Sequence, residues 1–292
     1  MRREFKDGVT AVTGLECFSI RQTLECGQCF RFKRIREEEG ACEYAIAAFD
    51  RVLRIRQDDT GVYFYPTGPD EFGSIWAAYF DLDTDYPRIR EELSRRDEWI
   101  RKAADEYGGI RILRQQPWEC LVSFILSQNN KIERIKSIIQ NITERFGEPL
   151  ADGYYAFPSP DTLAGASVDE LLACKAGFRA KYLADAAKKV SNGEVVLESL
   201  YDAPMEDARA ALMGIKGVGE KIADCVLLFS LGKSGAFPAD VWIKRVIREL
   251  YFGGGSVSYK TIGDFANERF GEHAGLAQEY LYAYAREHRI GV

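Results

Sequence analysis

Two residues with complementary chemistry, Lys221 and Asp240, stand nineteen positions apart in the second half of the chain. Backbone dipoles at the start of a helix disfavour a cation, and a neutral amine is a nucleophile. A carboxylate stabilises the positive charge that develops on a sugar ring as its glycosidic bond breaks. We therefore predict that Lys221 attacks and that Asp240 is its partner. Because Asp240 precedes an apolar helical run, it would also suit a plain N-cap.

The glycines ahead of this lysine predict a turn that can hold phosphate. In residues 212–225, one short helix is expected to end and another to begin, with Gly214, Gly217 and Gly219 between them. Glycine permits positive φ and a close approach of the backbone, and the amides at a helix start form a natural phosphate seat. A lone Gly-x-Gly would suit an ordinary helix–helix turn. The complete pattern favours DNA, with Gly217, Gly219 and the later Lys244 predicted as phosphate contacts.

The composition excludes several other chemistries. The chain has 292 residues, 46% of them hydrophobic, and a formal net charge of −6. It has no apolar run of membrane-spanning length and no signal-peptide core at its start, so we expect a cytoplasmic protein without a membrane partner. The acidic balance argues against non-specific DNA binding. If the protein binds DNA, the positive charge must be local, and backbone amides must supply much of the phosphate contact.

The cysteines and histidines predict neither a disulfide framework nor a zinc site. Seven cysteines are scattered over the chain, an odd number that favours reduced thiols. Cys26 and Cys29 form one Cys-x-x-Cys pair, but only two histidines, His273 and His288, are present to complete a metal site. This scarcity also excludes most mechanisms that use a histidine base.

The elements that must position these residues predict an α+β fold. Residues 1–106 are expected to form an antiparallel β domain, because residues 52–65 alternate apolar and polar residues around a turn at 58–61. Another strand is expected at 28–34, and the charged segment 87–106 is helical in character. Residues 107–292 are expected to form an all-helical domain. Its predicted helices begin at Pro117 and cover 132–146, 167–174, 180–190, 208–213, 221–231, 241–251 and 278–288.

The glycine hairpin, the lysine, and the Pro-x-Asp sequence before a helix together resemble the helix-hairpin-helix, Gly/Pro-Asp glycosylase superfamily. Within it the chain is similar over nearly its whole length to the 8-oxoguanine DNA glycosylase family, also called N-glycosylase/DNA lyase. The resemblance implies attack of Lys221 on the sugar C1′, departure of the base and formation of a Schiff base, with Asp240 assisting. Weak β-elimination can follow. It implies double-stranded DNA containing 8-oxoguanine as partner, a monomer, and a cytoplasmic location, at the nucleoid if the source is prokaryotic.

The resemblance also implies a base pocket assembled from distant segments. The carbonyl of Gly27 would accept the N7 hydrogen that 8-oxoguanine has and guanine lacks. Gln278 would read the Watson–Crick edge, while Tyr282 and Cys225 would contact the two faces of the base. Trp242 stands where many relatives have a histidine near a DNA phosphate, and Ala285 replaces the acid that pairs with it. We interpret this as a coordinated change in the pocket wall. Taken alone, Gly27 suits a strand bend and Tyr282 a core position.

Other residues match the part of the family that handles the gap in the duplex. Asn129 would fill the hole left by the flipped base, Phe178 would be the intercalating wedge, and Arg134 and Arg179 would contact the orphaned cytosine. Alone, each arginine would suit ordinary surface charge. No cofactor is required. A structural monovalent or divalent cation at the hairpin would be held by the backbone carbonyls of Met213, Ile215 and Val218.

Three alternatives remain. Glycosylases for adenine or oxidised pyrimidines often carry four closely spaced C-terminal cysteines, whereas no cysteine follows Cys225 here. A glycosylase for alkylated bases would keep Asp240 and usually lack Lys221. A non-catalytic DNA-binding module would use the hairpin for phosphate alone, and the combination of Lys221 with Asp240 argues against it.

Overall fold

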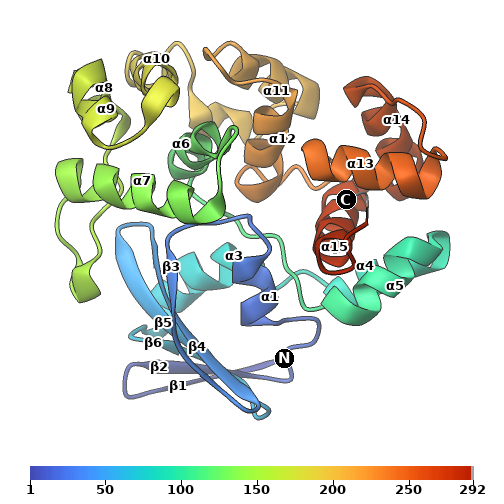
Figure 1. The fold of residues 1–292 in the computed structure, drawn as a ribbon. Helices are drawn as coiled ribbons and strands as arrows, with labels where there is room; N and C mark the ends of the chain where they lie inside the picture. The colour runs from blue at the N-terminus through green and yellow to red at the C-terminus, as the bar shows by residue number, and fades with distance from the viewer. Residues whose placement is uncertain (291–292) are drawn as a thin grey trace.

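The computed structural model describes residues 1–290, and its N-terminal part is one antiparallel sheet (Figure 1). The strand order is β1-β2-β6-β5-β4-β3, so β1 and β3 form the two edges of the sheet and the last strand, β6, lies inside it. The strands are β1 (Arg2–Lys6), β2 (Val9–Thr13), β3 (Phe32–Glu38), β4 (Ala41–Ala48), β5 (Arg51–Gln57) and β6 (Val62–Tyr65).

The hairpin predicted from alternation is present. Ile55 of β5 pairs with Phe64 of β6, and both side chains are fully buried. The turn is held by Asp58, whose backbone N–H donates to the Gly61 carbonyl at 3.0 Å. The strand predicted from residue 28 begins only at Phe32. Residues 28–31 instead lead out of a turn that is tied to residues 111–113.

The remaining chain is helical, and helices cover one side of the sheet (Figure 1). The helical segments before residue 110 are α1 (Ile20–Glu25), α2 (Pro69–Glu71), η1 (Phe72–Trp76), α3 (Ala77–Tyr79), α4 (Tyr86–Arg96) and α5 (Glu98–Tyr107). The segments after it are α6 (Pro117–Ser127), α7 (Ile132–Phe146), η2 (Ala151–Gly153), α8 (Pro160–Gly165), α9 (Val168–Ala173), η3 (Gly177–Arg179), α10 (Ala180–Ser191), η4 (Leu197–Leu200), α11 (Met205–Met213), α12 (Glu220–Phe229), α13 (Val241–Tyr251), α14 (Tyr259–Phe270), η5 (Gly271–His273) and α15 (Ala274–Glu287).

The helix predicted over 87–106 is interrupted at Asp97. That residue has an extended backbone (φ −147°), and its carboxylate accepts a hydrogen bond from the Ile100 N–H at 3.0 Å. It therefore ends α4 and caps α5. The same carboxylate also accepts from Tyr251 Oη at 2.9 Å and Arg269 Nε at 3.0 Å, which fixes α5 against α13 and α14.

Two buried clusters divide the molecule. One lies between the sheet and the short helices after it, with Ile55, Phe64 and Trp76 at its centre. The larger cluster joins the helices, and it includes Leu93 of α4 and Ile100 of α5. Thus α4 and α5 pack with the helical part of the chain, while the boundary at 106/107 stays a prediction. The predicted α+β fold class is confirmed. No helix in residues 1–290 is long and apolar enough to cross a membrane.

Candidate active site

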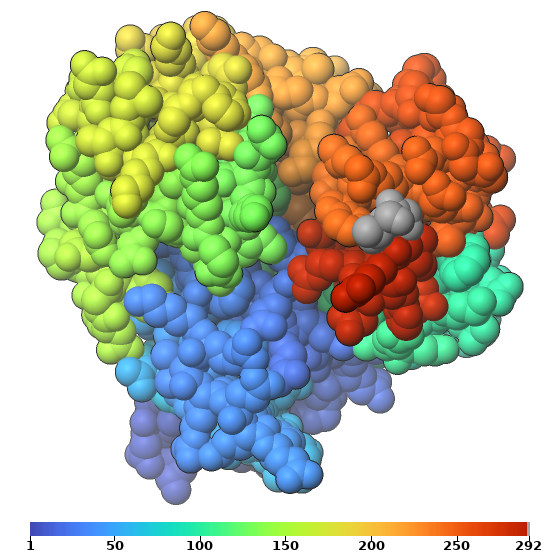
Figure 2. All heavy atoms as spheres, viewed as in Figure 1, coloured from blue at the N-terminus to red at the C-terminus, as the bar shows by residue number. Residues whose placement is uncertain are grey.

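A cleft of about 140 Å³ lies where the turn after α1 meets α6, α7, α12, α13 and α15. We call it the central cleft. Figure 2 shows the surface hollowed between α7 and α15, in the region where these elements converge. Six of the residues predicted from the sequence line the cleft together: Gly27, Lys221, Cys225, Asp240, Gln278 and Tyr282.

Lys221 is positioned by the glycine hairpin. Gly217 has φ +83°, and a Cβ atom there would lie 2.5 Å from the ring of Tyr182, so only glycine fits this turn. Gly219 is the N-cap residue of α12, which places Lys221 in the first helical turn. The lysine is half-buried, and its Nζ lies 5.1 Å from the centroid of the Phe124 ring. The amine is thus partly shielded from water beside an aromatic face.

Cys225 lies one helical turn beyond Lys221 on the same face of α12. Burial raises the pKa of its thiol to about 12, and the neighbouring Lys221 opposes this shift only in part. The thiol is therefore neutral near pH 7 and forms a polarisable wall of the cleft rather than a competing nucleophile.

Asp240 reaches the cleft as the N-cap of α13. Its Oδ1 accepts a hydrogen bond from the Ile243 N–H at 2.8 Å, which fixes the carboxylate at the helix start. The residue is half-buried and lines the same cleft as Lys221. The Asp240 side chain can therefore cap α13 and line the cleft with the Lys221 amine at the same time.

Gly27 forms a turn that only glycine readily adopts, with φ +103°. Its position is fixed by the next residue, because the fully buried Gln28 side chain makes three hydrogen bonds to backbone groups. Its Nε2 donates to Thr23 O at 2.9 Å and Arg111 O at 2.8 Å, and its Oε1 accepts from the Leu113 N–H at 2.8 Å. The turn is therefore rigid before any ligand arrives.

Helix α15 presents Gln278 and Tyr282 to the cleft, four residues apart on one face. Gln278 is only 4% exposed, and its Oε1 has no hydrogen-bond partner. A buried acceptor without a partner is costly, so this atom is available for a donor that enters the cleft.

The residues predicted to handle the gap form a second group, near the loop between α6 and α7. Arg179 is 3% exposed, and it donates through Nε to Gln128 O at 2.8 Å and through Nη2 to Asn129 O at 2.9 Å. Its guanidinium lies 4.3 Å from the centroid of the Phe178 ring, which is 54% exposed. Arg134 is exposed and close enough to help lower the pKa of Arg179, for which burial is the main cause. Arg179 is thus buried rather than ordinary surface charge.

Some predicted residues lie outside the central cleft. Trp242 is half-buried on α13 and is not among the residues that line it. Lys244 is on the same helix, with Nζ 5.2 Å from the centroid of the Tyr259 ring. In the hairpin, Ile215 and Val218 are buried and Met213 is 41% exposed; the Ile215 carbonyl accepts from the Val218 N–H at 3.0 Å. In residues 1–290, no group of three or more His, Cys, Asp or Glu side chains could hold a metal ion.

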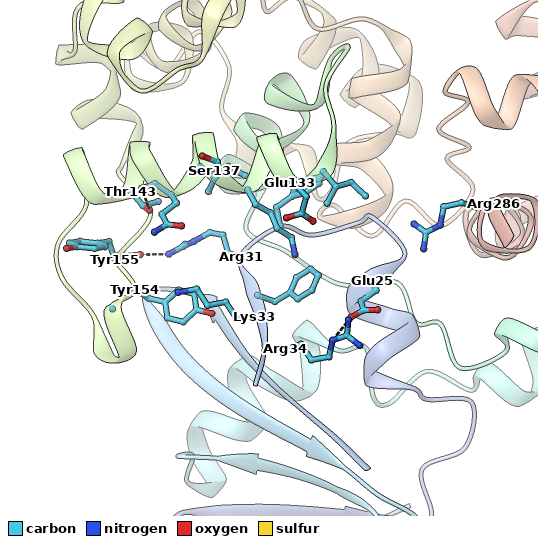
Figure 3. Close-up of a pocket in the computed structure, with 17 residues that line it drawn as sticks. Glu25, Arg31, Lys33, Arg34, Glu133, Ser137, Thr143, Tyr154, Tyr155 and Arg286 are labelled. Carbon is cyan, nitrogen blue, oxygen red and sulfur yellow. Dashed lines mark hydrogen bonds and ion pairs between the residues drawn. The ribbon is translucent and has the colours of Figure 1, made fainter. Parts of the chain in front are cut away.

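A larger groove of about 730 Å³ lies between β3 and α7 (Figure 3). Lys33 lies over the Tyr154 ring at 5.0 Å and Lys136 over the Phe32 ring at 3.5 Å, while Arg34 pairs with Glu25 at 3.6 Å. Of these two hollows, the smaller central cleft is the one that Lys221 and Asp240 line together, so we assign the chemistry to that cleft despite its size.

The sequence analysis did not identify two residues that shape the cleft. Gln28 fixes the Gly27 turn, and Glu279 lines the cleft with its carboxyl buried. The polar pair Gln278-Glu279 inside a helix whose other residues are mainly apolar was a signal that both side chains have a purpose. Gln28 had no such signal, because two of its partners, Arg111 O and the Leu113 N–H, are backbone groups more than eighty residues away.

The fold and the cleft define a base-excision repair glycosylase of the helix-hairpin-helix class. Residues 11–121 match the 8-oxoguanine DNA glycosylase N-terminal domain, and residues 122–270 match the HhH-GPD superfamily of base excision DNA repair proteins. The N-glycosylase/DNA lyase OGG1 of Arabidopsis thaliana is 30% identical over 279 residues, which cover 89% of this chain and 75% of that protein. The N-glycosylase/DNA lyase of Saccharomyces cerevisiae is 30% identical over 272 residues, with 85% and 72% covered.

Solved structures agree over the whole chain. The 8-oxoguanine glycosylase/lyase of Clostridium acetobutylicum, in complex with double-stranded DNA that has cytosine opposite 8-oxoguanine, is 41% identical with a TM-score of 0.93, and 99% of each chain is covered. Its apo form gives 42% identity and a TM-score of 0.91, with 97% of this chain and 98% of that chain covered. The chain belongs to the N-glycosylase/DNA lyase family of 8-oxoguanine glycosylases.

Proposed function

We propose that this chain excises 8-oxoguanine from double-stranded DNA by using Lys221 as the nucleophile. The observation that carries the proposal is the gathering of Lys221 and Asp240 in one cleft with the base-contacting candidates Gly27 and Gln278. Nζ forms a bond to the sugar C1′ as the bond to the base breaks, and opening of the sugar gives a Schiff base. Asp240 stabilises the positive charge that develops on the sugar. β-Elimination of the 3′ phosphate gives the lyase activity.

The base is selected by groups on opposite sides of the central cleft. The Gly27 carbonyl accepts the N7 hydrogen of 8-oxoguanine, whereas guanine would place a lone pair against it. The unpartnered Oε1 of Gln278 accepts from the N–H groups of the Watson–Crick edge. Tyr282 and Cys225 contact the faces of the base. Trp242, predicted in the pocket wall, has no part in this selection, because it lies outside the cleft lining.

The duplex is held by the hairpin and by the loop between α6 and α7. The amides around Gly217 and Gly219 and the ammonium of Lys244 contact phosphates. Phe178 wedges into the stack, Asn129 fills the gap, and Arg134 and Arg179 contact the opposite cytosine. A cation on the carbonyls of Met213, Ile215 and Val218 would strengthen the hairpin, but the chemistry needs no cofactor. The enzyme acts as a monomer in the cytoplasm, at the nucleoid in a prokaryote.

The decisive experiment is covalent trapping with borohydride on duplex DNA that contains 8-oxoguanine opposite cytosine. Borohydride reduces the Schiff base to a stable amine, so the wild-type protein should become attached to DNA. Lys221→Gln should abolish trapping and excision while retaining binding to the damaged duplex. Lys260→Gln is the matched control, because Lys260 is an exposed lysine of α14 paired with Asp264. Undiminished trapping in Lys221→Gln would assign the chemistry to another amine, and no trapping of the wild type would favour a DNA-binding module.

A further inference from the structure

Glu279 is a buried carboxyl in the central cleft that the chemistry proposed above does not use. It follows Gln278 on α15, is 3% exposed, and lines the cleft with Lys221 and Asp240. One of its oxygens, Oε2, is buried without a hydrogen-bond partner. A buried carboxyl that is poorly satisfied is costly, so its presence here calls for a compensating role.

The groups beside this carboxyl belong to two different parts of the cleft. The Cys26 thiol and the Gln278 amide line the cleft together with it. Cys26 is itself fixed, because its Sγ lies 3.3 Å from Thr23 O and accepts from Gln28 Nε2 at 3.3 Å. Since Cys26 directly precedes Gly27, Glu279 lines the cleft beside both the Gly27 turn and the base-contacting face of α15.

We propose that Glu279 is a positioning residue for base recognition, which joins the Cys26-Gly27 turn to Gln278 and thereby fixes the two groups that contact the base. The proposal rests on the function proposed above. A protonated carboxyl donates its O–H to the Cys26 sulfur and accepts from the Gln278 amide nitrogen. The amide nitrogen is then directed at Glu279, and Gln278 Oε1 faces the donors of the base. The Cys26 S–H is directed at Thr23 O, so an ionised carboxylate, which has no hydrogen to donate, keeps this contact only if the thiol turns away from Thr23 and donates to it instead.

The surroundings of Glu279 keep it neutral over part of the physiological range. Burial raises the pKa of the carboxyl to about 7; the charge of Asp240 also raises it, while Cys26, Arg286 and Gln278 lower it. The other titratable groups that face this part of the cleft are Cys29, Cys225, Tyr282 and Lys221. With that pKa, roughly nine-tenths of the carboxyl is neutral at pH 6 and about one-thirtieth at pH 8.5.

The test compares the wild type with Glu279→Gln and Glu279→Ala in single-turnover reactions. Glutamine keeps a donor and an acceptor at all pH values, whereas alanine removes both. Glu287→Gln is the control, because Glu287 is exposed on the same helix. Each protein reacts with duplex DNA that contains 8-oxoguanine opposite cytosine and with a duplex that contains a preformed abasic site. The abasic duplex has no base to position, so it reports Lys221 without the base-contacting groups.

We expect Glu279→Ala to excise 8-oxoguanine about tenfold more slowly or worse, because small displacements of contacting groups are costly. The rate at which Glu279→Ala is trapped on the abasic duplex should differ from the wild-type rate by no more than about twofold. The ratio of the Glu279→Gln rate to the wild-type rate should rise by about tenfold between pH 6 and pH 8.5, following loss of the neutral carboxyl. This ratio cancels the pH effects that both proteins share.

Three results would overturn the proposal: normal excision by Glu279→Ala, equal losses on both duplexes, or a rate ratio that does not change with pH. If Glu279→Ala does not fold, the pH dependence of the Glu279→Gln ratio decides alone. A wild type that reacts with neither duplex would instead refute the proposed function. A wild type that reacts only with the abasic duplex would leave Lys221 chemistry intact and refute base recognition, and Glu279 positioning with it.

Discussion

At the scale of single residues, the central cleft contains side chains that have a structural role as well as a proposed chemical one. Asp240 is a helix cap and, in the proposed chemistry, the carboxylate that stabilises positive charge on the reacting sugar. Its Oδ1 accepts a hydrogen bond from the Ile243 N–H, which fixes the orientation of the carboxylate in the structure without DNA. Lys221 is likewise held by the first turn of α12 beside the Phe124 ring. Such preorganisation lowers the cost of placing charge where the transition state needs it.

This double duty of Asp240 predicts a separation between stability and catalysis. Asparagine caps helices about as well as aspartate but carries no charge. We expect Asp240→Asn to lower the single-turnover excision rate about 100-fold or more, with little change in melting temperature. Asp240→Ala should lose both properties. Normal cutting by Asp240→Asn combined with earlier melting would show that the residue is only a cap.

At the scale of elements, Arg179 connects η3 to the loop between α6 and α7. Its guanidinium donates to the carbonyls of Gln128 and Asn129 and stacks near Phe178, so it holds the predicted wedge and gap filler side by side. Arg134 lies on α7 with its side chain exposed, so it is not buried against the loop as Arg179 is. The two arginines predicted to contact cytosine therefore differ in structural role.

This difference predicts distinct outcomes for the two alanine variants. We expect 8-oxoguanine to be excised about tenfold faster or more opposite cytosine than opposite adenine, since each lost contact costs about 1–3 kcal/mol. Arg134→Ala should flatten this preference more than it lowers the best rate. Arg179→Ala should slow excision on every pair and lower the unfolding free energy by about 2 kcal/mol or more, because charged hydrogen bonds are lost. Equal rates of the wild-type protein on all four pairs would contradict cytosine reading.

Local sequence patterns were sufficient for elements whose signals are local. The β5–β6 hairpin followed from alternation, and α7 and α13 match the predicted ranges 132–146 and 241–251. Helix α14 was not predicted, although Ser258 caps it through the Thr261 N–H at 3.0 Å. The strand predicted from residue 28 failed because Gln28 hydrogen-bonds across the chain to Arg111 and Leu113. Such contacts depend on tertiary packing and leave no periodic pattern.

The residues of the candidate site likewise divide into those with a local sequence signal and those that depend on tertiary packing. Lys221 and Asp240 could be identified as cleft candidates because each lies at a predicted helix start, and Gln278 and Tyr282 because four residues separate them on one helix. Glu279 could not be given a role from sequence, because its properties come from burial against Cys26 and Asp240, which lie on other elements. A carboxyl inside a helix is usually solvated, and only the packing of α15 reverses that expectation.

At the scale of the whole molecule, three buried carboxyls make stability depend on pH. Burial raises the pKa of Glu119, Asp224 and Glu279, although Arg31 opposes the shift for Glu119 and Tyr259 and Arg209 oppose it for Asp224. A group whose pKa is raised in the folded state contributes stability at low pH and loses it as the pH rises through the folded value. The protein should therefore be less stable at pH 8.5 than at pH 5.

Glu279 offers the sharpest measurement of this effect, because its pKa rises from 4.5 to about 7. Between pH 5 and pH 8.5 the unfolded carboxyl is already largely ionised, whereas the folded one must ionise inside the cleft. This costs the folded state about 2–3 kcal/mol over that range.

Chemical denaturation of the wild type and Glu279→Gln at both pH values isolates the contribution of Glu279, since all other titrating groups are shared. We expect the wild type to lose about 2–3 kcal/mol more unfolding free energy than the variant over this range. Equal losses in the two proteins would mean that water reaches the carboxyl and that Glu279 is ionised throughout, which would remove the physical basis for its pH-dependent role in base recognition.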